Sequence, residues 1–295
     1  MDRTGHRPLI HLALRGLCGL CVLCGFLPTT PGAAPVPAPA GDANNCLYLP
    51  PDFEKSVLFY HSFGLAAEKP EINRLGAKLG KPAGQLVEAL TGKGFTPAKG
   101  GRALSLGALA LPLTRPITVG LWFRLDEPMK AESGFHLISL HTPAGYVSNF
   151  VRGKGQWCAL KQPTFVMQLY RFPGISNVNG IRFGDAWLAE KAWHHAAVTI
   201  SEGSRVRVYW DGRLRSDVTP RGRMFGAKDV VRNIGLGPHW LGHPMTVDEL
   251  LVLDRALAAD EVGSYTTAVL KLAEQRFGVR GAGARSKGAT PARPD

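Results

Sequence analysis

The chain has 295 residues, of which 45% are hydrophobic and 20% are charged, and its formal net charge is +12. This composition is ordinary for a globular protein, and about 220 residues remain for a folded body once a targeting segment and a tail are set aside. A basic balance favours acidic glycans or an anionic envelope as partners, or simply reflects a solvated surface with a basic tail. Nucleic acid is not an expected partner, because no recognised nucleic-acid motif is present.

Residues 1–40 are typical of an export signal. A basic start is followed by an apolar run of h-region length, Leu17–Leu27, and then by a Pro/Ala-rich stretch, Pro31–Ala40. Cleavage is expected after Ala40, and Arg15 interrupts the apolar span, which disfavours the alternative of an uncleaved membrane anchor. We therefore expect a secreted, periplasmic or cell-envelope protein that meets a membrane only if this segment is retained.

Two of the five cysteines, Cys46 and Cys158, lie outside the apolar run and would remain in the mature chain. An exported protein with two cysteines can form one disulfide, and the alternative is two independent thiols.

The N-terminal half of the expected domain contains strand patterns separated by polar segments. Residues 41–55 form a lead, and residues 64–84 have no apolar period and are expected to be a loop. The glycine-rich stretch Thr91–Gly101 is not a phosphate-binding loop, because it lacks the G-x-x-x-x-G-K-[ST] pattern. Strands are expected at Val57–Phe63, Gln85–Leu90 and Arg102–Leu106.

The middle of the chain gives its clearest strand at Ile117–Arg124, where alternate residues are large and apolar. The segment 143–163 matches no element, and a loop of this length is often a binding loop. Further strands are expected at His136–His141, Phe165–Phe172 and Val178–Phe183, the last two as a hairpin.

Residues 193–217 predict three consecutive antiparallel strands. Trp193–Ile200 is short and ends in β-branched residues. In Ser204–Trp210 the residues Val206, Val208 and Trp210 share one face, and the other face, with its arginines and Tyr209, is expected to meet water. Asp211-Gly212 is a two-residue hairpin signal, because a type I′ turn needs positive φ at both central positions.

The end of the chain predicts a strand and then a helix. Thr246–Leu253 is apolar on both faces in its second half, which suits a strand covered on both sides. Ala258–Gln275 has helical character, and residues 276–295 form a basic tail of disordered composition. The expected fold class is all-β, an antiparallel two-sheet sandwich with a short C-terminal helix.

Four short segments of the C-terminal third form a recognisable series. Their residues are Trp193, His194, His195, Ala197, Val198 and Thr199; Tyr209, Asp211 and Gly212; Ile234 and Gly235; and Val247, Asp248, Glu249, Leu250, Arg255, Ala256, Leu257, Glu261 and Val262. In this order and spacing they resemble the laminin-G-like jelly-roll domains of the concanavalin A-like lectin/glucanase superfamily. The resemblance implies a two-sheet jelly-roll sandwich over residues 56–275, in which the glycines of 91–101 shape a turn before a strand.

No catalytic motif accompanies this resemblance, and the chain is not expected to be an enzyme. Glycoside hydrolysis needs two carboxyls that face one bond, and related glucanases place them in an E-x-D-x-x-E strand that is absent here. Asp248 and Glu249 are adjacent on a strand, so we expect them to point to opposite faces, with Asp248 tying the strand to a loop. Glu261 is expected at a helix start. The chain also lacks a G-x-S-x-G nucleophile elbow.

The histidines do not predict a metal centre. His194 and His195 are neighbours on a strand, so they are expected to face opposite ways and to be structural. His239 and His243 lie four residues apart in a proline-bounded loop, where this spacing has no helical geometry. No cofactor is expected; calcium, which some relatives bind, stays an open alternative without assigned ligands.

Aromatic residues in loops or at strand ends are the candidate ligand contacts, because aromatic rings can stack on sugar faces. The expected function is a non-catalytic module that binds a glycan or an envelope protein, with carbohydrate as the first ligand class. The alternatives are a glycoside hydrolase of the glucanase superfamily with an unrecognised site, and a structural or protein-interaction domain. The candidate ligand contacts are Trp240, His239, His243, Trp157 and Tyr146.

Overall fold

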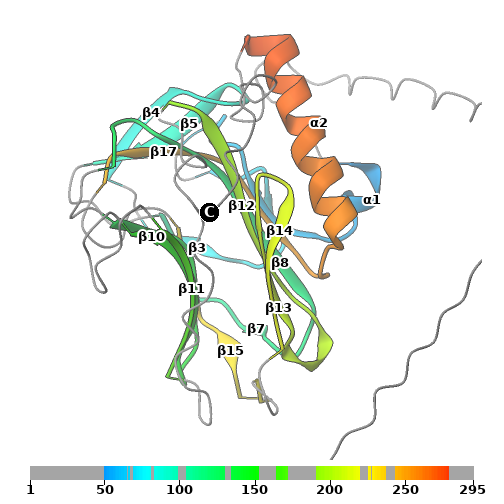
Figure 1. The fold of residues 1–295 in the computed structure, drawn as a ribbon. Helices are drawn as coiled ribbons and strands as arrows, with labels where there is room; N and C mark the ends of the chain where they lie inside the picture. The colour runs from blue at the N-terminus through cyan, green and yellow to red at the C-terminus, as the bar shows by residue number, and fades with distance from the viewer. Residues whose placement is uncertain are drawn as a thin grey trace, which may run out of the picture. The chain divides into compact units, whose positions relative to one another are not determined.

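A computed structural model describes residues 50–64, 66, 69–80, 83–98, 104–129, 134–152, 164–171, 191–219, 225–226, 228–236 and 243–278. In these ranges the chain forms two antiparallel sheets that face each other, with one long helix outside them (Figure 1). The predicted all-β sandwich with a C-terminal helix is confirmed. The predicted export segment 1–40 lies outside the described residues, as does the tail from residue 279 onward.

The larger sheet has nine strands and contains the elements that the sequence marks most clearly. Its main path runs β14 (Arg213–Val218), β13 (Val206–Trp210), β12 (Trp193–Ile200), β8 (Ile117–Leu125), β17 (Met245–Leu253), β1 (Val57–His61) and β2 (Ile72–Asn73). A hairpin of β4 (Gly84–Glu88) and β5 (Lys93–Pro97) joins it, because β5 also pairs with β17.

The smaller sheet has six strands, and a separate two-stranded pair accompanies it. The six strands are, in spatial order, β11 (Thr164–Tyr170), β10 (Tyr146–Arg152), β9 (Gly134–His141), β16 (Asn233–Leu236), β6 (Leu104–Gly107) and β3 (Lys78–Leu79). The pair is β15 (Val230–Val231) with β7 (Leu111–Pro112). The remaining elements are α1 (Pro51–Glu54), a 3₁₀ turn at Glu202–Ser204 and α2 (Ala259–Phe277).

The main core lies between the two sheets, and strand alternation supplies it. On β8, Ile117, Val119, Leu121 and Phe123 belong to this core, as the sequence predicts. Trp122, between two of them, points the other way into a second apolar cluster beneath α2. The central strands of the large sheet are therefore buried on both faces.

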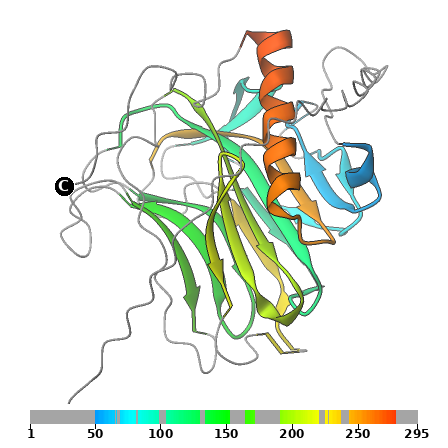
Figure 2. The ribbon, with the colours of Figure 1, turned by 45° about the vertical axis from the view of Figure 1, so that its right-hand side comes forward.

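Helix α2 covers the outer face of the nine-stranded sheet (Figure 2). It begins where Glu261 accepts a hydrogen bond from Ala258 N at 2.8 Å, which confirms the predicted helix-start role of Glu261. It ends at Gly278, whose φ of 63° is left-handed. Apolar residues of α2 pack on Trp122, Trp193 and Tyr209. The prediction that Tyr209 faces water is therefore wrong, because the helix covers that face of β13.

Several strands lie where the sequence predicts none. The glycine-rich stretch 91–101 contains β5, the expected loop 64–84 contains β2 and β3, and the unassigned segment 143–163 contains β10. β11 was expected to pair with Val178–Phe183, but in the described chain it pairs with β10, and 178–183 lies outside the described residues. These strands form through pairing with distant segments, which local pattern does not report.

Within the described residues, no helix is both long enough and apolar enough to cross a membrane.

Candidate ligand-binding face

The outer face of the six-stranded sheet carries a row of aromatic and polar side chains, here called the aromatic row: Tyr170, Tyr146, His141, Asn233 and Lys78. Tyr146 pairs with Tyr170 on one side and His141 on the other, and His141 pairs with Asn233. Their neighbours along the strands, including Leu169, Val147 and Leu140, belong to the core. Because side chains alternate along a strand, the row faces away from that core.

Gly107 connects Asn233 to the last member of the row. Lys78 pairs with Gly107, and a Cβ placed on Gly107 would lie 3.9 Å from Asn233 Nδ2. Lys78 is exposed, whereas the next residue, Leu79, packs against the core. The row therefore crosses all six strands, from β11 to β3.

The aromatic end of the row is a tilted stack of half-buried rings. The Tyr146 and Tyr170 ring centroids are 5.0 Å apart at 35°, and those of His141 and Tyr146 are 5.5 Å apart at 37°. The guanidinium of Arg171 lies 5.1 Å from the Tyr170 centroid. A ring cluster fixed on strands offers an apolar surface of defined shape at small entropic cost.

A second row of small polar residues runs beside the first and is called the polar row: Gln168, Ser148, Ser139, Gly235 and Ser105, each paired with the next. Ser139 Oγ lies 3.0 Å from Ser148 Oγ, and His136 Nδ1 lies 2.6 Å from Ser148 Oγ. The two rows are joined where Asn233 Nδ2 donates to Ser105 Oγ at 2.5 Å and Tyr146 OH donates to Gln168 Oε1 at 3.5 Å. Ser139 and Ser148 are buried, so the partly exposed polar side chains next to the ring stack are Gln168 and Asn233.

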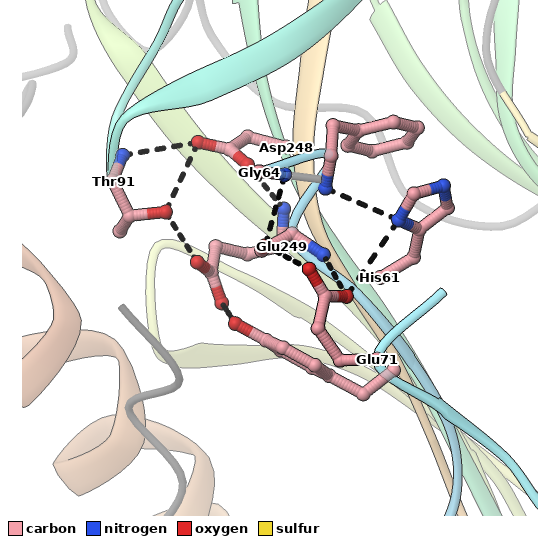
Figure 3. A network of polar contacts seen from close by, with 9 residues as sticks. His61, Gly64, Glu71, Thr91, Asp248 and Glu249 are labelled. Carbon is pink, nitrogen blue, oxygen red and sulfur yellow. Dashed lines mark hydrogen bonds and ion pairs between the residues drawn. The ribbon is translucent and has the colours of Figure 1, made fainter. Parts of the chain in front are cut away.

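A buried cluster of two carboxyls lies in the other sheet, in the middle of β17 (Figure 3). Thr91 donates from its backbone N to Asp248 Oδ2 at 3.1 Å, and its hydroxyl also binds Glu249 Oε1. Tyr60 OH donates to Glu249 Oε2 at 2.5 Å. The prediction that Asp248 and Glu249 point to opposite faces is wrong: both carboxyls reach Thr91.

A β-bulge explains this convergence. The register of β17 against β8 shifts between Asp248 and Leu251, and Glu249 has a φ of 50°. An extra residue in one strand interrupts the strict alternation of side chains, so adjacent residues can reach the same group. The predicted role of Asp248, tying the strand to a loop, is confirmed by its bond to Thr91, which lies between β4 and β5.

Burial dominates the chemistry of these carboxyls. Burial raises the pKa of Glu249 to about 7, although hydrogen bonds from Thr91 and Tyr60 act in the opposite direction. Burial and the neighbouring Glu249 hold the pKa of Asp248 well above its ordinary value. The two residues are 0% and 1% exposed, so this pair lies out of reach of a polysaccharide substrate.

A second polar group adjoins this pair in Figure 3. Glu71 accepts hydrogen bonds from Ser62 N at 2.9 Å and Ser62 Oγ at 2.5 Å, and it lies 3.7 Å from His61 Nδ1. Burial raises the pKa of Glu71, but the hydrogen bonds from His61 and Ser62 outweigh it and leave this pKa below its ordinary value. The group fixes the chain between β1 and β2.

His194 and His195 face opposite sides of β12, as predicted. The ring of His194 adjoins Phe123 and Trp210 of the main core, and its Nδ1 lies 3.0 Å from Asp211 Oδ2. His195 lies under α2, with its Nδ1 3.0 Å from Thr266 Oγ1. Burial lowers the pKa of His195 to about 4. Both histidines are packed structural residues, and the described part of the chain contains no cluster of three metal-ligating side chains.

Of the predicted ligand contacts, the structure places one in the aromatic row and one in the interior. Tyr146 lies at the centre of the ring stack. His243 is buried, its Nε2 lies 2.9 Å from Glu127 O, and its ring stacks on Phe135. Outside the described residues lie Trp240, His239 and Trp157, together with both predicted disulfide cysteines, Cys46 and Cys158.

Sequence reasoning missed the other members of the aromatic row. Tyr170 and Gln168 share one face of an expected strand, which was a usable signal of a polar outer face. His141, Asn233 and Lys78 carry no such signal, because they meet only through the pairing of strands that are far apart in the chain.

Solved structures with a similar fold include binding domains of toxins and one domain of an arabinanase. The binding domain of Paraclostridial Mosquitocidal Protein 1 is 14% identical, with a TM-score of 0.55, and the match covers 73% of this chain and 53% of that one. Botulinum neurotoxin type C, which interacts with two ganglioside molecules, is 9% identical, with a TM-score of 0.55 and coverage of 74% and 52%. The chain thus spans about half the length of these toxin domains.

A third structure matches over nearly its whole length. Domain 4 of AbnA, a GH43 extracellular arabinanase from Geobacillus stearothermophilus, was solved in complex with arabinotriose. It is 17% identical, with a TM-score of 0.52, and the match covers 72% of this chain and 98% of that domain. At these identities the likeness concerns the fold. Among curated proteins, none matches the sequence.

The family model described as concanavalin A-like lectin/glucanases superfamily, a laminin-G type, matches residues 98–263. This range includes β8, β12, β13 and β17, the strands that carry both apolar clusters. The chain therefore belongs to the concanavalin A-like lectin/glucanases superfamily.

Proposed function

We propose that the chain is an exported, non-catalytic module that binds carbohydrate on the outer face of its six-stranded sheet. The observation that carries this proposal is the stack of Tyr170, Tyr146 and His141 beside the partly exposed amides of Gln168 and Asn233. Sugar rings have apolar C–H faces and polar edges. An aromatic platform next to short hydrogen-bonding side chains suits both.

The two outer faces of the sandwich differ in a way that supports this location. Helix α2 packs over the nine-stranded sheet and buries its outward residues. In the described ranges, no helix packs on the six-stranded sheet, and the aromatic row is half-buried with Lys78 exposed. A partly accessible polar and aromatic face on a rigid sheet is a suitable place for a ligand.

The similar structures support a binding role by analogy of fold. The arabinanase domain was solved with arabinotriose, and botulinum neurotoxin type C interacts with gangliosides. A hydrolase is the less favoured alternative, because the carboxyls of Asp248 and Glu249 converge in a buried position. A protein ligand is a further alternative, since another neighbour binds rat synaptotagmin II.

A glycan array probed with the full chain tests the proposal. We expect a restricted set of glycans to bind, and we expect Tyr146→Ala and Tyr170→Ala each to weaken binding about tenfold or more, because each removes part of the platform. Phe277→Ala is the matched control: Phe277 is an aromatic residue that is 39% exposed, and it lies at the end of α2, the helix that packs on the other sheet.

A silent array, or binding that both tyrosine variants leave unchanged, would remove carbohydrate recognition by this face. Release of reducing ends from a bound glycan by the purified chain would instead favour the hydrolase.

Export is tested separately by deleting residues 1–40. The expected result is retention of the shortened chain in the cytoplasm, seen by cell fractionation, while the full chain leaves it. Continued delivery of the shortened chain would contradict an export signal in this segment.

A further inference from the structure

The charged residues in and next to the strands of the six-stranded sheet are all basic. The sequences of β11, β10, β9, β16, β6 and β3 contain no aspartate or glutamate. Lys78 lies at one end of the aromatic row, and Arg171 follows Tyr170 at the other end. Arg232, directly before β16, is also exposed. A negatively charged ligand would therefore meet no carboxylate from these strands.

Some arginines elsewhere in the described chain have acidic partners. Arg205 lies 2.5 Å from Asp217, and Arg255 lies 2.5 Å from Glu261. By contrast, Lys78, Arg171 and Arg232 form no ion pair within the described ranges. No carboxylate in the described part of the chain neutralises their charge.

The spacing of the charges indicates the size of the ligand. Strands in a sheet lie about 4.8 Å apart, so the five steps from β11 to β3 span roughly 24 Å. One monosaccharide cannot contact both Arg171 and Lys78 over this distance. A polymer of several sugars can lie along the row, with acidic groups near both ends.

We infer that the ligand of this face is an acidic polysaccharide, one whose sugars carry carboxylate or sulfate groups. This inference rests on the proposed carbohydrate function and adds the ligand class. The rings of Tyr146 and Tyr170 contact sugar faces, and Lys78 and Arg171 bind the acidic groups. The guanidinium of Arg171 lies over the Tyr170 ring, so it adjoins a sugar that contacts the neighbouring part of the ring stack.

The test compares polymers that differ only in charge, measured by biolayer interferometry with the full chain. Polygalacturonate is paired with its carboxyl-reduced form, and dextran sulfate with dextran. We expect at least one acidic polymer to bind at least tenfold more tightly than its neutral partner, and this preference to shrink as salt is raised.

Variants that remove charge then test whether the preference for acidic polymers arises on the six-stranded sheet. Lys78→Gln with Arg171→Gln is expected to weaken binding of the acidic polymer about tenfold and leave the neutral partner unchanged, because exposed charges contribute modestly one by one. Arg205→Gln with Arg207→Gln removes the same charge from the other sheet and is the matched control. It should change binding less than twofold.

The outcomes separate this inference from the proposed function. Equal binding of acidic and neutral polymers, with loss on Tyr146→Ala, keeps carbohydrate binding and refutes the acidic class. Equal losses in the two charge variants reduce the preference to general attraction and refute the site. No binding to any polymer, together with a silent glycan array, removes the proposed function itself. Tight binding to phosphatidylserine vesicles without any preference among polymers would identify an anionic membrane instead.

Discussion

At the scale of single residues, folding places the carboxyl of Glu249 in a fully buried site. Burial raises its pKa from the ordinary 4.5 to about 7. Between these values the unfolded chain loses this proton while the folded chain keeps it. Stability contributed by this group is therefore present at acid pH and falls as pH rises from about 4.5 to about 7.

Glu249→Gln should remove this pH dependence. Relative to the parent chain, the variant is expected to gain on the order of 3 kcal/mol in free energy of unfolding between pH 4.5 and pH 8, because an amide has no proton to lose. Urea unfolding across this range measures the difference. His195, whose pKa is lowered to about 4, gives the opposite slope at acid pH, but it is present in both chains and cancels. If the free energy of unfolding changed with pH in the same way for both chains, the raised pKa of Glu249 would be contradicted.

Thr91 holds the two carboxyls together, so its hydroxyl should matter for stability. Thr91→Val keeps the shape and the backbone N–H but removes the hydroxyl bond to Glu249. We expect a loss of about 1–3 kcal/mol in free energy of unfolding at pH 5, because a buried acceptor loses its donor. The control is Thr267→Val on the exposed side of α2, where the change should stay within about 0.5 kcal/mol. Equal losses of stability in the two variants would show that the Thr91 hydroxyl stabilises the fold no more than an exposed hydroxyl does.

At the scale of elements, the turn between β13 and β14 fits closely against α2. Asp211 and Gly212 have φ values of 48° and 75°, which confirms the predicted type of hairpin. A Cβ on Gly212 would lie 3.1 Å from Thr266 Cβ and 3.2 Å from Gly263 Cα. Glycine is needed here for its backbone conformation and for the approach of the helix.

Gly212→Ala should therefore lose stability from backbone strain and from steric overlap with α2, whereas Gly76→Ala should lose it from backbone strain alone. Gly76 has a φ of 61°, but a Cβ there would meet nothing within 4 Å. We expect Gly76→Ala to lose roughly 1–2 kcal/mol from left-handed strain alone, and Gly212→Ala to lose more, because α2 must also shift. Thermal unfolding of both variants measures the difference. Equal losses would mean that the helix yields without cost.

At the scale of the whole molecule, the two apolar clusters share the same strands. On β8, Leu121 and Phe123 face the main core, and Trp122 between them faces α2. On β13, Trp210 and Tyr209 divide in the same way. Loss of either cluster removes support from strands that form the other, so we expect the described body to unfold as one unit.

Val269→Asp tests this coupling, because Val269 is 0% exposed and packs in the cluster under α2. A buried charge there should lower stability by several kcal/mol. Far-UV circular dichroism follows the loss of helix, and near-UV circular dichroism follows the loss of fixed tryptophan packing. The midpoints of the two unfolding transitions should decrease by the same amount. Lys271→Asp places the same residue on the exposed side of α2 and should shift neither midpoint greatly. A helix that melts alone would contradict a single unit.

The sequence predicts those features of the molecule that depend on residues close together in the chain. Alternation at Ile117–Arg124 and Ser204–Trp210, the Asp211-Gly212 turn and the period of α2 each lie within a few residues, and all are present as predicted. Glycine-rich β5 and the unassigned β10 are strands only because distant segments pair with them.

The candidate site follows the same division. Tyr146 was recognisable as an aromatic residue near a strand end, but its neighbours Tyr170, His141 and Asn233 come from three other strands. The bulge that turns Glu249 toward Thr91 depends on how β17 pairs with β8. The sequence by itself thus determined the elements with local periodicity and the all-β class. Only the tertiary structure decided the aromatic row and the carboxyl pair, because strand order and register bring together residues that no local pattern relates.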